Sequence, residues 1–129
     1  MKTFYHGSPT PHIEVLEPRF DPRLDTEGIF IADEPFGPMM FALLPVRAHA
    51  AVDYTTKNGK FIEGKVSTQE INEEGWLYTF EVEESIIKER GSGQFYLAMP
   101  VRIIKTEKIL KEDVLYLGWK IEIKPNREA

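Results

Sequence analysis

Residues 28–36, GIFIADEPF, contain the strand and the helix start that decide the fold class. The continuous apolar run at 29–31 is typical of a short, buried β-strand. The acidic pair and the proline that follow are typical of a helix N-terminus. We therefore expect a helix to begin near Phe36 and to end before Pro45, because the residue before a proline disfavours the helical conformation.

The chain on either side of this stretch is rich in strand signals. We expect further strands at 4–6, 13–16, 52–56, 60–62, 76–82, 94–98, 101–104 and 119–123. Asn58-Gly59 predicts a tight hairpin turn between two of them. We also expect an exposed loop at 19–27, a second short helix at 46–51 and a helical turn at 111–117. Many short strands with few short helices predict an α+β fold of two packed, mostly antiparallel β-sheets, in one domain spanning residues 1–129.

The composition limits the classes of function. The chain has 129 residues, of which 42% are hydrophobic and 29% charged, as in an ordinary globular domain. Its net charge of −5 disfavours unselective binding to nucleic acid or anionic lipid. It has no cysteine, which excludes disulfides, zinc–thiolate sites and cysteine nucleophiles. No apolar stretch approaches the roughly 20 residues that span a bilayer, so we expect a soluble, cytoplasmic protein without membrane partners.

His6 is the most informative of the three histidines. The histidines lack the close spacing of a metal-binding motif, so we expect no metal site. His6 stands at a predicted strand end, from which its side chain can point into a cleft. Gly7 follows, and a glycine lets a ligand approach the backbone closely. The alternative is a structural histidine that is hydrogen-bonded to a neighbouring loop.

Four short motifs occur in an order that is known from one enzyme superfamily. They are YHGS at 5–8, GIFIAD at 28–33, a helix carrying FA at 41–42, and QFYL at 94–97. This order resembles the His-Tyr-Glu branch of the ADP-ribosyltransferase superfamily, which includes diphtheria-toxin-like enzymes, poly(ADP-ribose) polymerases and rifamycin ADP-ribosyltransferases. The resemblance extends from residue 4 to about residue 110. It implies that NAD binds as a substrate in a cleft between two sheets, and that ADP-ribose passes to an acceptor: a protein, a nucleic acid or a small molecule.

The resemblance also implies roles for the first two motifs. His6 would hydrogen-bond the adenosine ribose of NAD, and the backbone of Gly7 would hold the nicotinamide amide. Ser8 would be the usual small hydroxyl partner. Phe30 replaces the family's tyrosine and would stack on nicotinamide, while Phe41 would close its other face. Ordinary core packing is the alternative role for both phenylalanines.

The third motif departs from the family. Gln94 stands where the family has a glutamate that stabilises the oxocarbenium-like transition state, and an amide lacks the negative charge for this. Glu84 or Glu89 could supply a carboxylate instead. Both belong to an acidic cluster with Glu81 and Glu83, and most residues of such a cluster are expected to lie on a solvated edge. A catalytically inactive relative, acting as a nucleotide-binding or protein-interaction module, is the alternative function. The resemblance offers three arginines for the diphosphate of NAD: Arg19, Arg23 and Arg47.

Overall fold

The computed structural model describes residues 1–22, 24–45, 49–90 and 94–124. Its strands are β1 (Lys2–Ser8), β2 (Val15–Leu16), β3 (Arg19–Asp21), β4 (Thr26–Ile31), β5 (Ala50–Lys57), β6 (Lys60–Thr68), β7 (Glu74–Val82), β8 (Lys88–Arg90), β9 (Gln94–Leu97), β10 (Val101–Arg102), β11 (Lys105–Leu110) and β12 (Trp119–Ile123). The helices are α1 (Phe36–Ala42), the 3₁₀ turn η1 (Glu84–Ile86) and α2 (Lys111–Leu117). The expected α+β class with packed, mostly antiparallel sheets is confirmed, although the described strands form four sheets, one of them a short pair, where two were expected.

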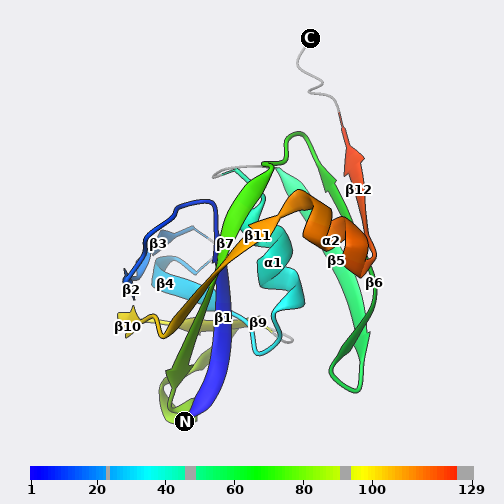
Figure 1. Cartoon of the computed structure of the whole chain (residues 1–129). Helices are drawn as coiled ribbons and strands as arrows, with labels where there is room; N and C mark the ends of the chain where they lie inside the picture. Colours follow the sequence, from blue (N-terminus) through cyan, green and yellow to red (C-terminus); the bar gives the residue numbers. More distant parts are fainter. Residues whose placement is uncertain (23, 46–48, 91–93, 125–129) are drawn as a thin grey trace.

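Two sheets combine strands from the N-terminal and the C-terminal halves of the chain (Figure 1). One has the strand order β1-β7-β11 and the other β3-β4-β9-β8, and both are antiparallel. Tyr5 and Ala32 join them through a single backbone bridge with N···O distances of 2.8 and 3.0 Å. Apolar side chains from both sheets and from the short pair β2–β10 form one core: Phe4, Leu16, Ile29, Ile31, Phe80, Val82, Leu97 and Val101. In this pair, Leu16 of β2 lies opposite Val101 of β10.

Helix α1 packs directly on the backbones of β1 and β7, because glycines stand at the contact points. A Cβ added at Gly7 would overlap the carbonyl oxygen of Pro38, and one added at Gly75 would overlap that of Ala42. Pro38 and Ala42 are four residues apart and so lie on one side of the helix. The two glycines therefore form the seat of α1 on the sheet.

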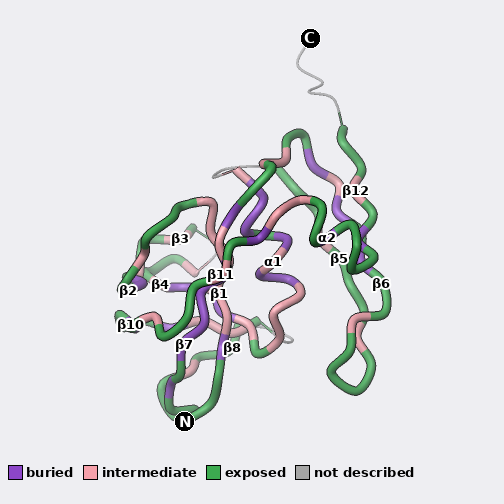
Figure 2. Tube along the Cα trace, in the orientation of Figure 1, coloured by how far each residue is buried: buried purple, intermediate pink, exposed green. Residues whose placement is uncertain are grey.

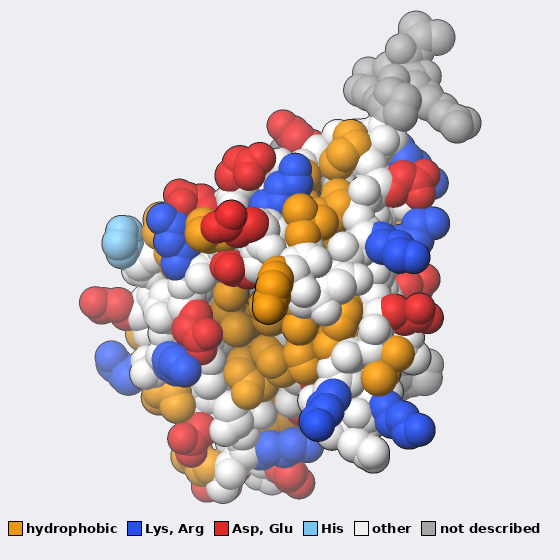
Figure 3. Space-filling model, turned by 45° about the vertical axis from the view of Figure 1, so that its right-hand side comes forward, with side chains coloured by type: hydrophobic (Ala, Val, Ile, Leu, Met, Phe, Trp, Pro, Cys, Tyr) orange, Lys and Arg blue, Asp and Glu red, His pale blue; other side chains and the backbone are white. Residues whose placement is uncertain are grey.

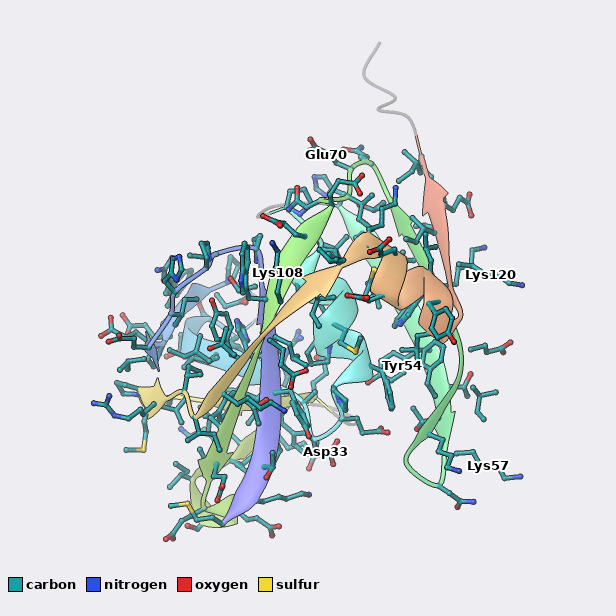
Figure 4. All side chains as sticks on the ribbon, viewed as in Figure 1. Asp33, Tyr54, Lys57, Glu70, Lys108 and Lys120 are labelled. Atoms are coloured by element: carbon teal, nitrogen blue, oxygen red, sulfur yellow. The ribbon has the colours of Figure 1, made fainter. Side chains whose placement is uncertain are left out.

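A third sheet, in the order β12-β6-β5, covers the other side of α1. Tyr54 and Trp119 both lie opposite Gly64, one from each neighbouring strand, and their ring centroids are 5.8 Å apart. Phe61 adds a third ring, 5.4 Å from Trp119. Tyr54 occupies the space between β5 and α1 (Figure 4). The small residue at position 64 thus allows the aromatic rings to meet across the middle strand.

Burial decreases from the centre of the molecule toward its edges. Figure 2 shows buried segments in β1, β4, β7 and α1, whereas the tip of the β5–β6 hairpin is exposed. Tyr116 on α2 is 95% exposed. On the face shown in Figure 3, apolar side chains gather in the centre and charged side chains surround them.

Several local expectations are confirmed and others are wrong. Helix α1 begins at Phe36, and Asn58 and Gly59 form the hairpin turn with φ values of 53° and 75°. The segment 19–27 is not a loop throughout, because β3 and β4 pair there. The helix expected at 46–51 is wrong at 50–51, which begin strand β5, and residues 46–48 lie outside the described residues.

The acidic pair before α1 does not cap the helix. Pro35 is the N-cap residue and makes no side-chain capping bond. Asp33 instead forms an ion pair with Lys2, with an Nζ···Oδ2 distance of 3.7 Å. The Thr56 hydroxyl donates a hydrogen bond of 3.4 Å to a carboxylate oxygen of Glu34. The acidic pair therefore tethers the start of α1 to β1 and β5. In the described part of the chain, neither α1 nor α2 has the length and apolar character needed to cross a membrane.

Candidate functional site

Strands β1 and β4 separate just beyond the bridge at Tyr5 and Ala32. Both backbone groups of Tyr5 bond to Ala32, so they point away from β7. Backbone groups alternate in direction along a strand, and those of Gly7 therefore point to the same side as those of Tyr5. Among the described residues, β1 and β4 share only this one bridge. The N–H and C=O of Gly7 consequently face the point where the two strands separate.

His6 spans the separation with its ring. Its Nδ1 donates a hydrogen bond to the carbonyl oxygen of Phe30 at 2.8 Å, since a carbonyl can only accept. Burial lowers the pKa of His6 below its ordinary value, and the hydrogen bond to Phe30 opposes part of that shift. The ring is therefore neutral at pH 7, with its proton on Nδ1 and an acceptor lone pair on Nε2.

The lowered pKa of His6 predicts a pH-dependent stability. The unfolded chain takes up a proton at the ordinary histidine pKa, above the pKa of the folded state, so unfolding is favoured as pH falls. We expect urea denaturation of the wild type to show a loss of stability from pH 7.5 to 5.5. His6→Gln keeps a donor for Phe30 without a titrating ring, so its stability should vary less over the same range. Equal pH profiles for the two proteins would contradict this account.

Gly7 is small for a different reason from the one expected. Its Cα faces helix α1, where a side chain would overlap Pro38 and approach the Ala42 nitrogen to 2.8 Å. The close approach to this glycine is thus made by the protein's own helix. What Gly7 can present to a ligand is its backbone edge in the separation between β1 and β4.

The strand register brings three of the expected site residues together. Gly7 directly follows His6, whose ring is hydrogen-bonded to the backbone of Phe30. Phe30 lies opposite Tyr96 of β9, and side chains opposite each other in an antiparallel pair share a face. Gln94 is two residues from Tyr96 and so lies on that face as well. Phe30 is partly exposed and Gln94 is exposed.

The other expected residues are exposed, engaged elsewhere or on the opposite face of the sheet. The Ser8 hydroxyl accepts a hydrogen bond of 3.1 Å from the Thr10 backbone. Phe41 projects from α1 and is 50% exposed. Glu84 is exposed in η1. Glu89 lies opposite Phe95, which packs against the core, so the register places this glutamate on the face away from Gln94.

The arginines expected at the diphosphate of NAD are only partly accounted for. Arg19 lies opposite Gly28 in β4, two residues from Phe30 and therefore on the same face. Arg23 and Arg47 lie outside the described residues.

The structure adds three residues that were not expected at the site: Lys88, Arg90 and Tyr96. Lys88 and Arg90 of β8 lie opposite Tyr96 and Gln94, so all four share a face with Phe30. The Arg90 guanidinium donates a hydrogen bond of 3.2 Å to the side-chain oxygen of Gln94. The sequence signal for this group was the alternation of Lys88 with Arg90 and of Gln94 with Tyr96. This alternation indicates a shared face only when residues 88–90 are known to form a strand that pairs with β9.

A separate hollow of about 360 Å³ lies away from this group. It is lined by Ile13, Glu14, Arg102, Ile103, Ile104, Lys105 and Thr106. Its charges are partly neutralised within the protein, because Lys105 is paired with Glu107 at 2.9 Å. No group of three or more histidine, aspartate or glutamate side chains among the described residues is arranged to hold a metal ion.

Comparisons with known proteins give no family for the chain. A scan of protein-family models, a search of curated proteins and a search of solved structures found no significant match.

Proposed function

We propose that this chain is an NAD-binding domain of the ADP-ribosyltransferase type, which breaks the bond to nicotinamide and transfers ADP-ribose to an acceptor. The arrangement of Gly7, His6 and Phe30 where β1 separates from β4 carries the proposal. It presents a backbone donor and acceptor, an imidazole acceptor and an aromatic ring on two neighbouring segments, β1 and β4. A cytoplasmic location, where NAD is available, is part of this proposal.

Each of these groups suits one part of NAD. The Gly7 N–H and C=O are complementary to a carboxamide, which has one acceptor and two donors. The lone pair on His6 Nε2 can accept a hydrogen bond from a ribose hydroxyl. The ring of Phe30 offers a stacking surface for nicotinamide.

A second function is favoured by the state of Gln94. Its side-chain oxygen accepts a hydrogen bond from Arg90, so a cation stands beside the position where the enzymes of this family have a carboxylate. Such a neighbour disfavours a positively charged transition state. A catalytically inactive nucleotide-binding or interaction module is therefore the alternative.

Binding of nicotinamide tests the proposal directly. We expect isothermal titration to detect NAD and nicotinamide binding to the wild type, and Phe30→Ala to weaken both by about three- to tenfold, since an aromatic contact is worth about 0.5–1.5 kcal/mol. Phe20→Ala is the matched control, because Phe20 is 63% exposed and lies on the opposite face of the same sheet. The absence of heat with both ligands at millimolar concentration would leave the interaction module as the better proposal.

A further inference from the structure

One face of the β4–β9–β8 sheet combines aromatic rings with cations. Lys88, Tyr96 and Phe30 lie in one row across the three strands. Arg90 and Gln94 form the adjoining row. The two cations are exposed, whereas the two aromatic residues are partly exposed. The opposite face of β4 and β9 carries the buried apolar residues Ile29, Ile31 and Leu97. The aromatic and cationic side chains are therefore on the side turned away from that core.

The pairing of Arg90 with Gln94 decides which ligand groups this face can bind. A guanidinium has only donors, so the Gln94 atom facing it is the acceptor oxygen. The remaining polar atoms of the pair are the amide nitrogen of Gln94 and the other N–H groups of Arg90, all of which are donors. The Lys88 ammonium adds three more donors. The polar groups of this pair and Lys88 thus offer hydrogen atoms and positive charge to a ligand.

Arg19 adds positive charge to this face, and Asp21 offsets part of it. Arg19 of β3 shares the face, opposite Gly28, which is two residues from Phe30 in β4. Glu89 and Glu27 lie opposite Phe95 and Phe20 and so belong to the other face. Asp21 of β3 also lies on this face, opposite Thr26 at the start of β4, and its negative charge is four β4 positions away from Phe30. In a chain with a net charge of −5, positive charge is locally concentrated around Phe30 and Tyr96.

We propose that this face binds the phosphate group of a nucleotide, with Arg90, Lys88 and the Gln94 amide as donors and with an aromatic ring of the ligand on Phe30 or Tyr96. A phosphate offers only acceptors and negative charge, which complements this donor set, and arginine binds it through two parallel N–H groups. The inference rests on the proposed function only in treating the ligand as a nucleotide. It assigns Gln94 to phosphate binding, in contrast to the ribose contact that the family resemblance implies.

Titration with AMP, adenosine and inorganic phosphate tests this site. We expect AMP to bind more tightly than adenosine by at least tenfold, and more tightly than phosphate alone because only AMP has a ring. Arg90→Ala should weaken AMP binding roughly tenfold to a hundredfold, as the loss of a charged hydrogen bond does. Arg90→Lys keeps the charge without the two-pronged geometry and should lie between the wild type and Arg90→Ala. Lys60→Ala is the control, because Lys60 is an exposed cation in the β5–β6 hairpin.

The outcomes separate this inference from the proposed function. Arg90-dependent AMP binding without nicotinamide binding would support the phosphate site and remove the NAD-cleavage proposal. If nicotinamide binding depends on Phe30 while AMP binding is insensitive to Arg90→Ala, the NAD proposal is supported and the phosphate site is removed. Equal affinities for AMP and adenosine, or no AMP binding at millimolar concentration, would overturn the phosphate site. The thermal midpoint of each variant is compared with that of the wild type. Equal midpoints would show that these substitutions of exposed residues leave the fold intact.

Discussion

Replacing Gly75 by alanine is expected to destabilise the protein by about 3 kcal/mol, at the upper end of the cost of overpacking a core. The added methyl group would overlap the backbone carbonyl of Ala42 and approach the Ala42 Cβ to 3.0 Å. Backbone atoms cannot move aside as a flexible side chain does, so α1 itself must shift. Gly7→Ala should have a similar effect, because its new Cβ would overlap the Pro38 carbonyl. Urea denaturation of the wild type and both variants measures the difference.

Gly59→Ala separates packing from backbone strain. Gly59 has a φ of 75°, and an added Cβ would meet nothing within 4 Å. This change should therefore cost only about 1–2 kcal/mol, the penalty of a left-handed conformation for a residue with a side chain. A loss at Gly75 no larger than that at Gly59 would show that α1 does not rest on the glycine seat.

The largest expected effect on activity comes from restoring a carboxylate beside the proposed nicotinamide ribose. In the variant combining Gln94→Glu with Arg90→Ala, we expect nicotinamide release from NAD to rise roughly 10²–10³-fold, as one preorganised electrostatic contact contributes about 2.7–4 kcal/mol to catalysis. Gln94→Glu alone should gain less, because the Arg90 guanidinium would pair with the new carboxylate. Rates are compared at saturating NAD, since Arg90 is also assigned to phosphate binding.

Two glutamate variants test the competing source of the carboxylate. If Glu84 or Glu89 already stabilises the transition state, the wild type is active, one of the alanine substitutions abolishes activity, and Gln94→Glu changes little. If Gln94 marks an inactive relative, the wild type releases no nicotinamide above the background rate. Inactivity of the wild type and of every variant, including the Gln94→Glu, Arg90→Ala double variant, would remove the enzyme proposal and leave a binding module.

Local patterns predicted the elements whose determinants lie close together in the sequence. The hairpin turn at Asn58 and Gly59 was predictable, because two residues with positive φ suffice to form it. The start of α1 at Phe36 was also predicted from neighbouring residues. The acidic residues before it, however, have different partners from those expected. The helix expected at 46–51 was wrong at 50–51, because pairing with β6 places these two residues in a strand. Short apolar and alanine-rich segments allow either structure, and the neighbouring strand decides between them.

By itself, the sequence determined the α+β class, the main strands and four residues of the candidate site, His6, Gly7, Phe30 and Gln94. Only the tertiary structure decided how these groups act together. The hydrogen bond from His6 to Phe30 joins residues 24 positions apart and depends on β1 separating from β4. Gly7 and Gly75 meet one helix, which their distant positions in the sequence do not show. Arg90 faces Gln94 because β8 pairs with β9 in this register. Periodicity assigns residues to the faces of a single strand, whereas the pairing between strands determines which side chains share a site.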